Sequence, residues 1–92
     1  MSKLKIRVIR DDGGAGFVAT GQTAKTIRAL VLAGSLGVTA QELASWALRL
    51  AAYCHDLRKQ GLDIETIREA HDGGWHGRHV LHTIVRLKPV HD

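Results

Sequence analysis

Basic and aromatic side chains that suit nucleic-acid recognition lie in two stretches of this sequence, residues 49–59 and residues 75–79. In the first stretch, Arg49 comes near the start of a predicted helix. An arginine guanidinium is the side chain best shaped for O6 and N7 of guanine, which makes Arg49 the first candidate for a base-edge contact. The alternative is a solvated surface arginine.

The other candidates of the first stretch suit phosphates. Arg58 and Lys59 come near the end of the predicted helix, where they would either bind phosphate or complement the negative end of the helix dipole. Tyr53 would either form a hydrogen bond with a phosphate oxygen or lie half in the core, and His55 is a further candidate for contact with DNA. Asp56 lies among them, and its carboxylate would be repelled by phosphate.

The second stretch surrounds a glycine-rich tip and contains Trp75, His76 and Arg78. We expect Arg78 to lie near the minor groove or the nucleic-acid backbone, and His76 is a further candidate for contact with DNA. A tryptophan exposed at a hairpin tip has no evident packing role and would point to a partner, by intercalation, by stacking or by a protein contact. Trp75 is therefore an interaction candidate, and a Trp75 folded back onto the domain is the alternative.

Other chemistries find little support in the sequence. His76, His79 and His82 recur at every third residue, but on a strand that spacing alternates between faces, so we expect no metal site. The run of residues 13–16, Gly-Gly-Ala-Gly, lacks the lysine and hydroxyl residue of a phosphate-binding loop. We therefore expect a protein that is not an enzyme and has no cofactor.

The single cysteine supports the same expectation. Cys54 excludes an internal disulfide, and its neighbour His55 would point about 100° away on a helix, too far to activate the thiol. No secretory signal is recognisable, and no apolar run approaches the roughly 20 residues that span a bilayer. We expect a cytoplasmic protein with no membrane contact.

A strand and a hairpin are expected over residues 1–20. Residues 3–10 alternate basic and apolar side chains, which predicts a strand with Leu4, Ile6 and Val8 buried and a wet, basic opposite face. Residues 11–16 are rich in glycine and aspartate and favour a turn, after which residues 17–19 return as a second strand.

Three helices are expected over residues 21–61. The first, residues 22–33, would be followed by a second that begins at a capping box of Thr39 and Glu42 and carries Leu43, Ala44 and Ala47 inward. The third, residues 48–60, ends before Gly61. Apolar side chains at helical spacing predict the buried faces: Ala24, Ile27, Leu30 and Val31 in the first helix, and Leu50, Cys54 and Leu57 in the third.

A hairpin is expected over residues 62–88. Residues 62–69 favour a strand, residues 72–74 a turn, and residues 79–87 a second strand, with Pro89 as its end. Three helices followed by a hairpin form an α+β winged helix-turn-helix arrangement, with the third helix in the DNA groove and the hairpin as the wing. We expect one such domain over residues 1–92.

The sequence resembles a family of small winged-helix proteins common in phages and prophages. The family's pattern of Leu-Arg-x-x-Gly-x-x-Ile is matched by Leu57, Arg58, Gly61 and Ile64, and nearly the whole chain is similar, beginning with the Lys-Ile-Arg-Val strand. Related helices often have a basic residue at the position of Tyr53, so phosphate contacts are not carried over there. The resemblance implies a winged-helix fold and an assumed DNA-binding role.

The net charge of the chain favours a polyanionic partner, and its size limits the area that it can bury on DNA. Thirteen lysines and arginines against nine acidic residues give a formal net charge of +4. The leading hypothesis is a phage or prophage transcriptional regulator or accessory factor that binds double-stranded DNA. A single module buries about 600–1,000 Å² on DNA, so specific binding would need a homodimer, with the N-terminal strand or Trp46 as its surface, or a protein partner. The alternative hypothesis is a winged-helix module that binds or inhibits a host protein through Trp75.

Overall fold

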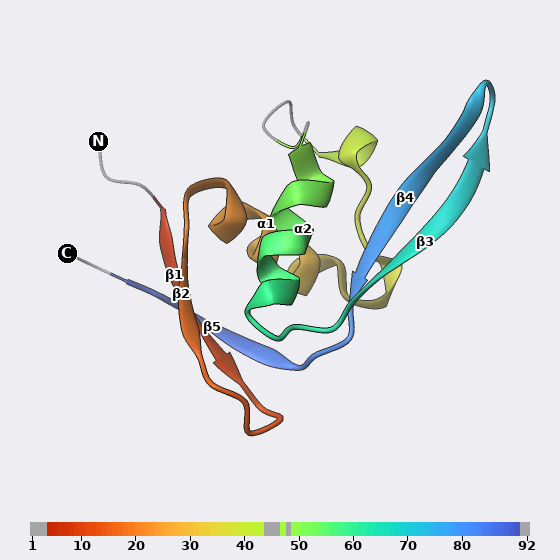
Figure 1. Cartoon of the computed structure of the whole chain (residues 1–92). Coiled ribbons are helices and arrows are strands. Elements are labelled where there is room, and N and C mark those ends of the chain that lie inside the picture. The colour runs from red at the N-terminus through yellow and green to blue at the C-terminus, as the bar shows by residue number, and fades with distance from the viewer. Residues whose placement is uncertain (1–3, 44–46, 48, 91–92) are drawn as a thin grey trace.

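The computed structural model describes residues 4–43, 47 and 49–90. Two sheets flank two α-helices, the N-terminal sheet on one side and a long hairpin on the other (Figure 1). The elements follow in the order β1 (Lys5–Arg10), β2 (Phe17–Thr20), α1 (Gly21–Ala33), η1 (Gly34–Leu36), η2 (Ala40–Glu42), α2 (Leu50–Lys59), β3 (Ile64–His71), β4 (Gly74–Leu81) and β5 (Val85–Pro89).

The N-terminal strand and hairpin are confirmed, and the sheet gains a third strand. Strand β1 lies in the centre of an antiparallel sheet of order β2-β1-β5. Ile6 and Val8 are buried beneath the helices, while Leu4 is half-buried. Because β1 is paired on both edges, a second copy could not pair with it as a further strand, and the homodimer itself stays a prediction.

Helix α1 has nearly the predicted bounds and one difference in its buried face. Ala24, Ile27 and Leu30 are fully buried, whereas Val31 is exposed. Thr26 takes the remaining buried position, and its hydroxyl donates to the carbonyl oxygen of Gln22 at 2.9 Å. A backbone hydrogen bond satisfies the polar group, so a threonine can replace an aliphatic residue there.

The second of the three predicted helices is wrong as an α-helix in the part that the structure describes. The capping box is confirmed, since Thr39 accepts from the backbone N–H of Glu42 and the Glu42 carboxylate accepts from that of Thr39. It starts only the short 3-10 turn η2, and Leu43 already has extended backbone. Ala47 is buried as predicted, while Ala44 and Trp46 lie outside the described residues.

Helix α2 confirms the core of the third predicted helix. It begins two residues later than expected, ends at Lys59, and buries Leu50, Cys54 and Leu57. Gly61 follows with φ of +98°, a left-handed conformation that favours glycine and lets the chain leave the helix. Burial raises the pKa of the Cys54 thiol to about 11, which keeps it protonated near neutral pH.

The wing hairpin is shorter than the predicted range of 62–88. Strands β3 and β4 pair from Ile64 with Leu81 to His71 with Gly74, around the predicted glycine-rich turn. The predicted strand of residues 79–87 divides in two, because residues 82–84 leave the hairpin and β5 then joins β1 in the other sheet. The chain thus closes the N-terminal sheet with its last strand.

The segment between η1 and η2 attaches to the wing. Val38 forms a bridge with His79, with backbone hydrogen bonds of 2.9 and 2.8 Å in the two directions. Through this bridge the Val38 segment pairs with the edge of β4 that does not pair with β3. No described helix is long and apolar enough to cross a membrane.

Candidate nucleic-acid interface

The exposed face of α2 carries three of the predicted contact residues without internal partners. Arg49 occupies the N-cap position and is exposed, and His55 and Lys59 are exposed further along the helix. None of these side chains makes a hydrogen bond or ion pair with another described residue. Tyr53 is half-buried, and Asp56 is exposed beside the cations.

Arg58, the fourth basic candidate of α2, fastens the helix to the wing. Its Nε donates to the carbonyl oxygen of Ile64 at 2.9 Å, and its Nη2 donates to Thr66 Oγ1 at 2.7 Å. Thr66 Oγ1 in turn lies 2.8 Å from Nδ1 of the buried His79. Arg58 therefore has a structural role between α2 and the hairpin. A phosphate contact by Arg58, as predicted, would have to compete with these two hydrogen bonds.

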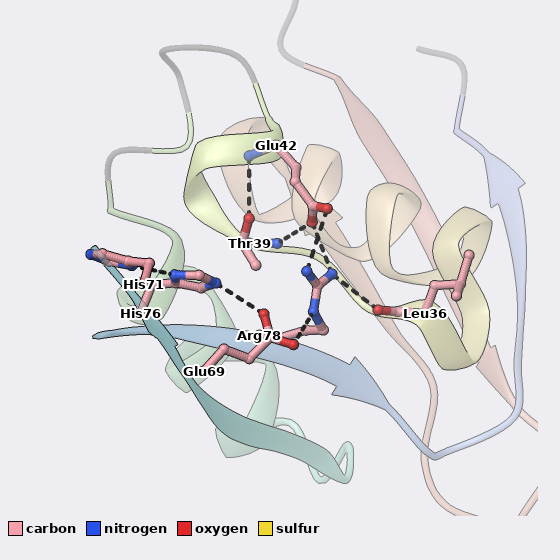
Figure 2. Close-up of polar contacts among 7 residues, drawn as sticks. All are labelled: Leu36, Thr39, Glu42, Glu69, His71, His76 and Arg78. Atoms are coloured by element: carbon pink, nitrogen blue, oxygen red, sulfur yellow. Dashed lines mark hydrogen bonds and ion pairs between the residues drawn. The ribbon is translucent and has the colours of Figure 1, made fainter. Parts of the chain in front are cut away.

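Arg78, predicted to contact the DNA backbone, lies at the centre of a network that joins the wing to η1 and η2 (Figure 2). Its Nε donates to Glu69 at 2.8 Å and its Nη1 donates to Glu42 at 3.0 Å and to the carbonyl oxygen of Leu36 at 3.2 Å. The side chain is 24% exposed. Because the guanidinium already donates its N–H groups to these acceptors, Arg78 is poorly placed to serve as a free phosphate contact.

His76 extends this network toward the hairpin tip. Its Nε2 lies 2.9 Å from Glu69 Oε1, and its Nδ1 lies 2.7 Å from Nδ1 of His71, on which its ring stacks (Figure 2). Glu69 thus binds both Arg78 and His76. Of the predicted wing contacts, His76 and Arg78 are both committed to internal partners.

The network changes the proton affinities of its members. Hydrogen bonding from Arg78 holds the pKa of Glu69 and that of Glu42 below the ordinary value of 4.5. His76 adds to the effect on Glu69, and the Thr39 backbone N–H adds to that on Glu42. Burial, and then the charge of Arg58, lower the pKa of His79 below 6.5.

These shifts predict that the fold loses stability on acidification in two stages. His79 is protonated more readily in the unfolded chain, so the free energy of unfolding falls as the pH drops below 6.5 toward the folded pKa of His79. Glu42 and Glu69 stabilise fully above pH 4.5, and this contribution is lost as the pH falls through their lowered pKa.

Urea unfolding between pH 8 and pH 3 measures this dependence. In the Arg78→Met variant we expect the first stage to persist and the second to shrink, because the carboxylates lose the partner that lowers their pKa. An Arg78→Met curve parallel to that of the wild type below pH 4.5 would contradict the role given to this network.

Trp75 is exposed, as the partner hypothesis required. Its exposed fraction is 56%, and the guanidinium carbon of Arg68 lies 4.0 Å from the centre of its ring. Trp75 borders a groove of about 320 Å³ between the wing and the start of α2. The other residues that line the groove are Ala40, Gln41, Leu50, Ala51, Thr66, His76, Gly77 and His79. The groove thus joins the first turn of α2 to the predicted wing contacts Trp75 and His76.

Charge is distributed unevenly over the molecule. Residues 62–83, which form the wing and its flanks, hold four carboxylates and two guanidiniums. Residues 4–33 and 84–90, which form the N-terminal sheet and α1, hold seven cations and two carboxylates. The wing is therefore acidic, and the excess positive charge lies on the sheet and α1.

Glu69, Thr66 and Arg68 are contact residues that sequence reasoning missed. A signal for them was present, because a turn at residues 72–73 fixes the hairpin register and places Glu69 opposite His76. The Arg78 contact with Glu42 had no such signal, since 36 residues separate them.

Comparison with known proteins gives one family. A family model described as a winged helix domain matches residues 16–91. The match starts just before β2 and includes both α-helices, the wing and β5. No curated protein and no solved structure matches the chain.

Proposed function

Because the chain belongs to the winged helix domain family, we propose that it binds double-stranded DNA, with the exposed face of α2 in the major groove. The observation that carries this proposal is the set of exposed side chains on α2, Arg49, His55 and Lys59, which have no described partner. Arg49 lies at the helix N-terminus, where recognition helices contact base edges.

The wing contributes differently from our expectation. Arg78 is engaged with Glu42 and Glu69, so the contact at the wing is assigned to Arg68 and Trp75, which stack on each other and are both exposed. In this proposal Arg58 holds the wing against α2 and Arg78 holds it against η1 and η2, while the tip reaches the sugar-phosphate backbone. Because the wing is acidic, only a few of its residues can contact phosphates.

The resemblance to phage and prophage proteins supports a role as a transcriptional regulator or accessory factor that acts on DNA in the cytoplasm. One recognition helix is a small module, which favours a homodimer or a protein partner at a specific site. Both statements belong to the proposal.

A salt titration of duplex binding tests the proposal. Each phosphate contact contributes about 0.9 to the slope of log affinity against log salt, so Arg49→Ala with Lys59→Ala should flatten the slope by about 1 to 2. The matched control is Leu32→Glu with Ser35→Glu, which takes the formal charge from +4 to +2 as well, at exposed sites near the end of α1. A slope that falls equally in the control would contradict contact by α2.

Binding of a host protein is the second candidate function, and the exposed Trp75 beside the groove favours it. Trp75→Ala distinguishes the two functions. A loss of duplex affinity in this variant places Trp75 in the DNA contact. If the duplex affinity and its salt slope are unchanged, Trp75 is available to bind a protein, where an exposed tryptophan can act as an interface hot spot.

A further inference from the structure

The outward face of the N-terminal sheet carries a block of four cations that the DNA-binding proposal for α2 does not use. Side chains alternate along a strand, so burial of Ile6 and Val8 directs Lys5 and Arg7 of β1 to the opposite face. Register places Arg7 directly opposite Lys88 of β5. Ile9 lies opposite Arg86, which brings Arg86 to the same face.

The spacing of the block is that of a regular array. Residues two apart on a strand are separated by about 7 Å, and neighbouring strands by about 5 Å. We name Lys5, Arg7, Arg86 and Lys88 the basic sheet face. It points away from the helices, on the far side of the molecule from the wing (Figure 1).

The pair of Arg7 and Lys88 is unfavourable for the sheet by itself, because like charges directly opposite each other destabilise an antiparallel pair. Neither side chain has an ion pair or hydrogen bond with a described residue. At one end of the block, Asp11 Oδ1 lies 3.3 Å from Arg86 Nε. Arg7 and Lys88 thus lack compensation by any carboxylate of the described residues.

An external polyanion would supply that compensation, and we propose that the basic sheet face binds the phosphate backbone of duplex DNA without reading its sequence. Duplex DNA carries one negative charge per about 1.7 Å of its axis, so one duplex can neutralise several of these closely spaced cations at once. Val18 is the one large aliphatic residue of these three strands that is exposed, which gives little apolar surface for insertion into a membrane.

This inference rests on the proposed function, because it assigns a second surface for the same ligand. The sheet is remote from the wing, so the second contact would engage DNA beyond the segment held by α2, either further along a bent duplex or on another one. Affinity would then depend on two separable groups of cations.

Fluorescence anisotropy with a labelled random-sequence duplex tests the assignment. Arg7→Gln with Lys88→Gln should flatten the salt slope by about 1 to 2 and lower the affinity at about 50 mM salt by tenfold or more. The control, Leu32→Glu with Ser35→Glu, has the same formal charge and should change both quantities much less. Equal changes in the two variants would overturn the proposal.

The same experiment tests two other ligands of the basic sheet face, an anionic membrane and an acidic protein. Anionic phosphatidylserine vesicles and polyglutamate are titrated in parallel with the duplex. Loss of vesicle or polyglutamate binding in Arg7→Gln with Lys88→Gln, at unchanged duplex binding, would also overturn the proposal. Arg49→Ala with Lys59→Ala separates it from the α2 contact, because each double variant tests one surface and leaves the other intact.

The Lys88→Glu variant distinguishes the loss of a DNA contact from a folding defect. This change converts the like-charged cross-strand pair into an opposite pair, so we expect thermal unfolding at a temperature a few degrees higher than in the wild type. Duplex affinity should fall in the same variant. A protein that is more stable and binds DNA as the wild type does would contradict the assignment.

Discussion

Gly37→Ala should reduce the free energy of unfolding by about 3 to 5 kcal/mol, enough to unfold much of a marginally stable small domain. Gly37 has φ of +66°, and an added Cβ would lie 2.6 Å from the carbonyl oxygen of His79 and 2.8 Å from Val80 Cγ2. Backbone atoms cannot move aside without breaking the bridge between Val38 and His79. The substitution therefore combines strain with loss of the attachment between the wing and the η1–η2 segment.

Gly34→Ala is the matched control for this prediction. Gly34 has a similar φ of +57°, but an added Cβ would meet nothing within 4 Å. We expect a loss of about 1 to 2 kcal/mol from backbone strain alone. Urea unfolding of both variants measures the difference, and equal losses would show that η1 does not approach β4 as closely as described.

Arg58→Met should cost about 1 to 2 kcal/mol of stability, because it removes the bonds to the Ile64 carbonyl and Thr66 while keeping an unbranched apolar side chain. The value is moderate because the guanidinium is partly exposed to water, which competes for the same bonds. The pKa of His79 should rise, since the charge of Arg58 lowers it, and should stay below 6.5 because burial is the larger cause.

Lys59→Met provides the control, because the neighbouring cation is exposed and makes no contact with a described residue. Its loss of stability should stay within about 0.5 kcal/mol. Thermal unfolding gives both losses, and NMR titration of His79 gives the pKa. If Arg58→Met and Lys59→Met proved equally stable, Arg58 would be available for DNA, as the sequence alone led us to expect.

Local features of the fold were predictable from the sequence because their causes lie within a few residues. Period-2 alternation identified β1, and the stripe of Leu50, Cys54 and Leu57 identified α2 and its buried face. The capping box at Thr39 formed as predicted, since both of its bonds join residues three apart. The α-helix expected after it did not form in the described part, where Leu43 adopts extended backbone.

The candidate site was predictable only in its exposed part. Arg49, His55 and Lys59 are exposed on α2, as its periodicity implied, and Trp75 is exposed near the hairpin tip. A pattern of charges along the chain does not say which cations meet an internal acceptor. Arg78 therefore could not be distinguished from a free contact.

The sequence by itself determined the buried faces of β1 and α2, the end of α2 before Gly61 and the turn of the wing, because hydrogen bonds and periodicity over a few residues decide them. Tertiary structure alone decided that β5 leaves the hairpin to pair with β1, that Arg78 binds Glu42, and that Arg7 faces Lys88. These contacts join residues that are dozens of positions apart. Their formation depends on how the whole core packs, so each recognition residue is available for DNA only as far as that packing leaves it free.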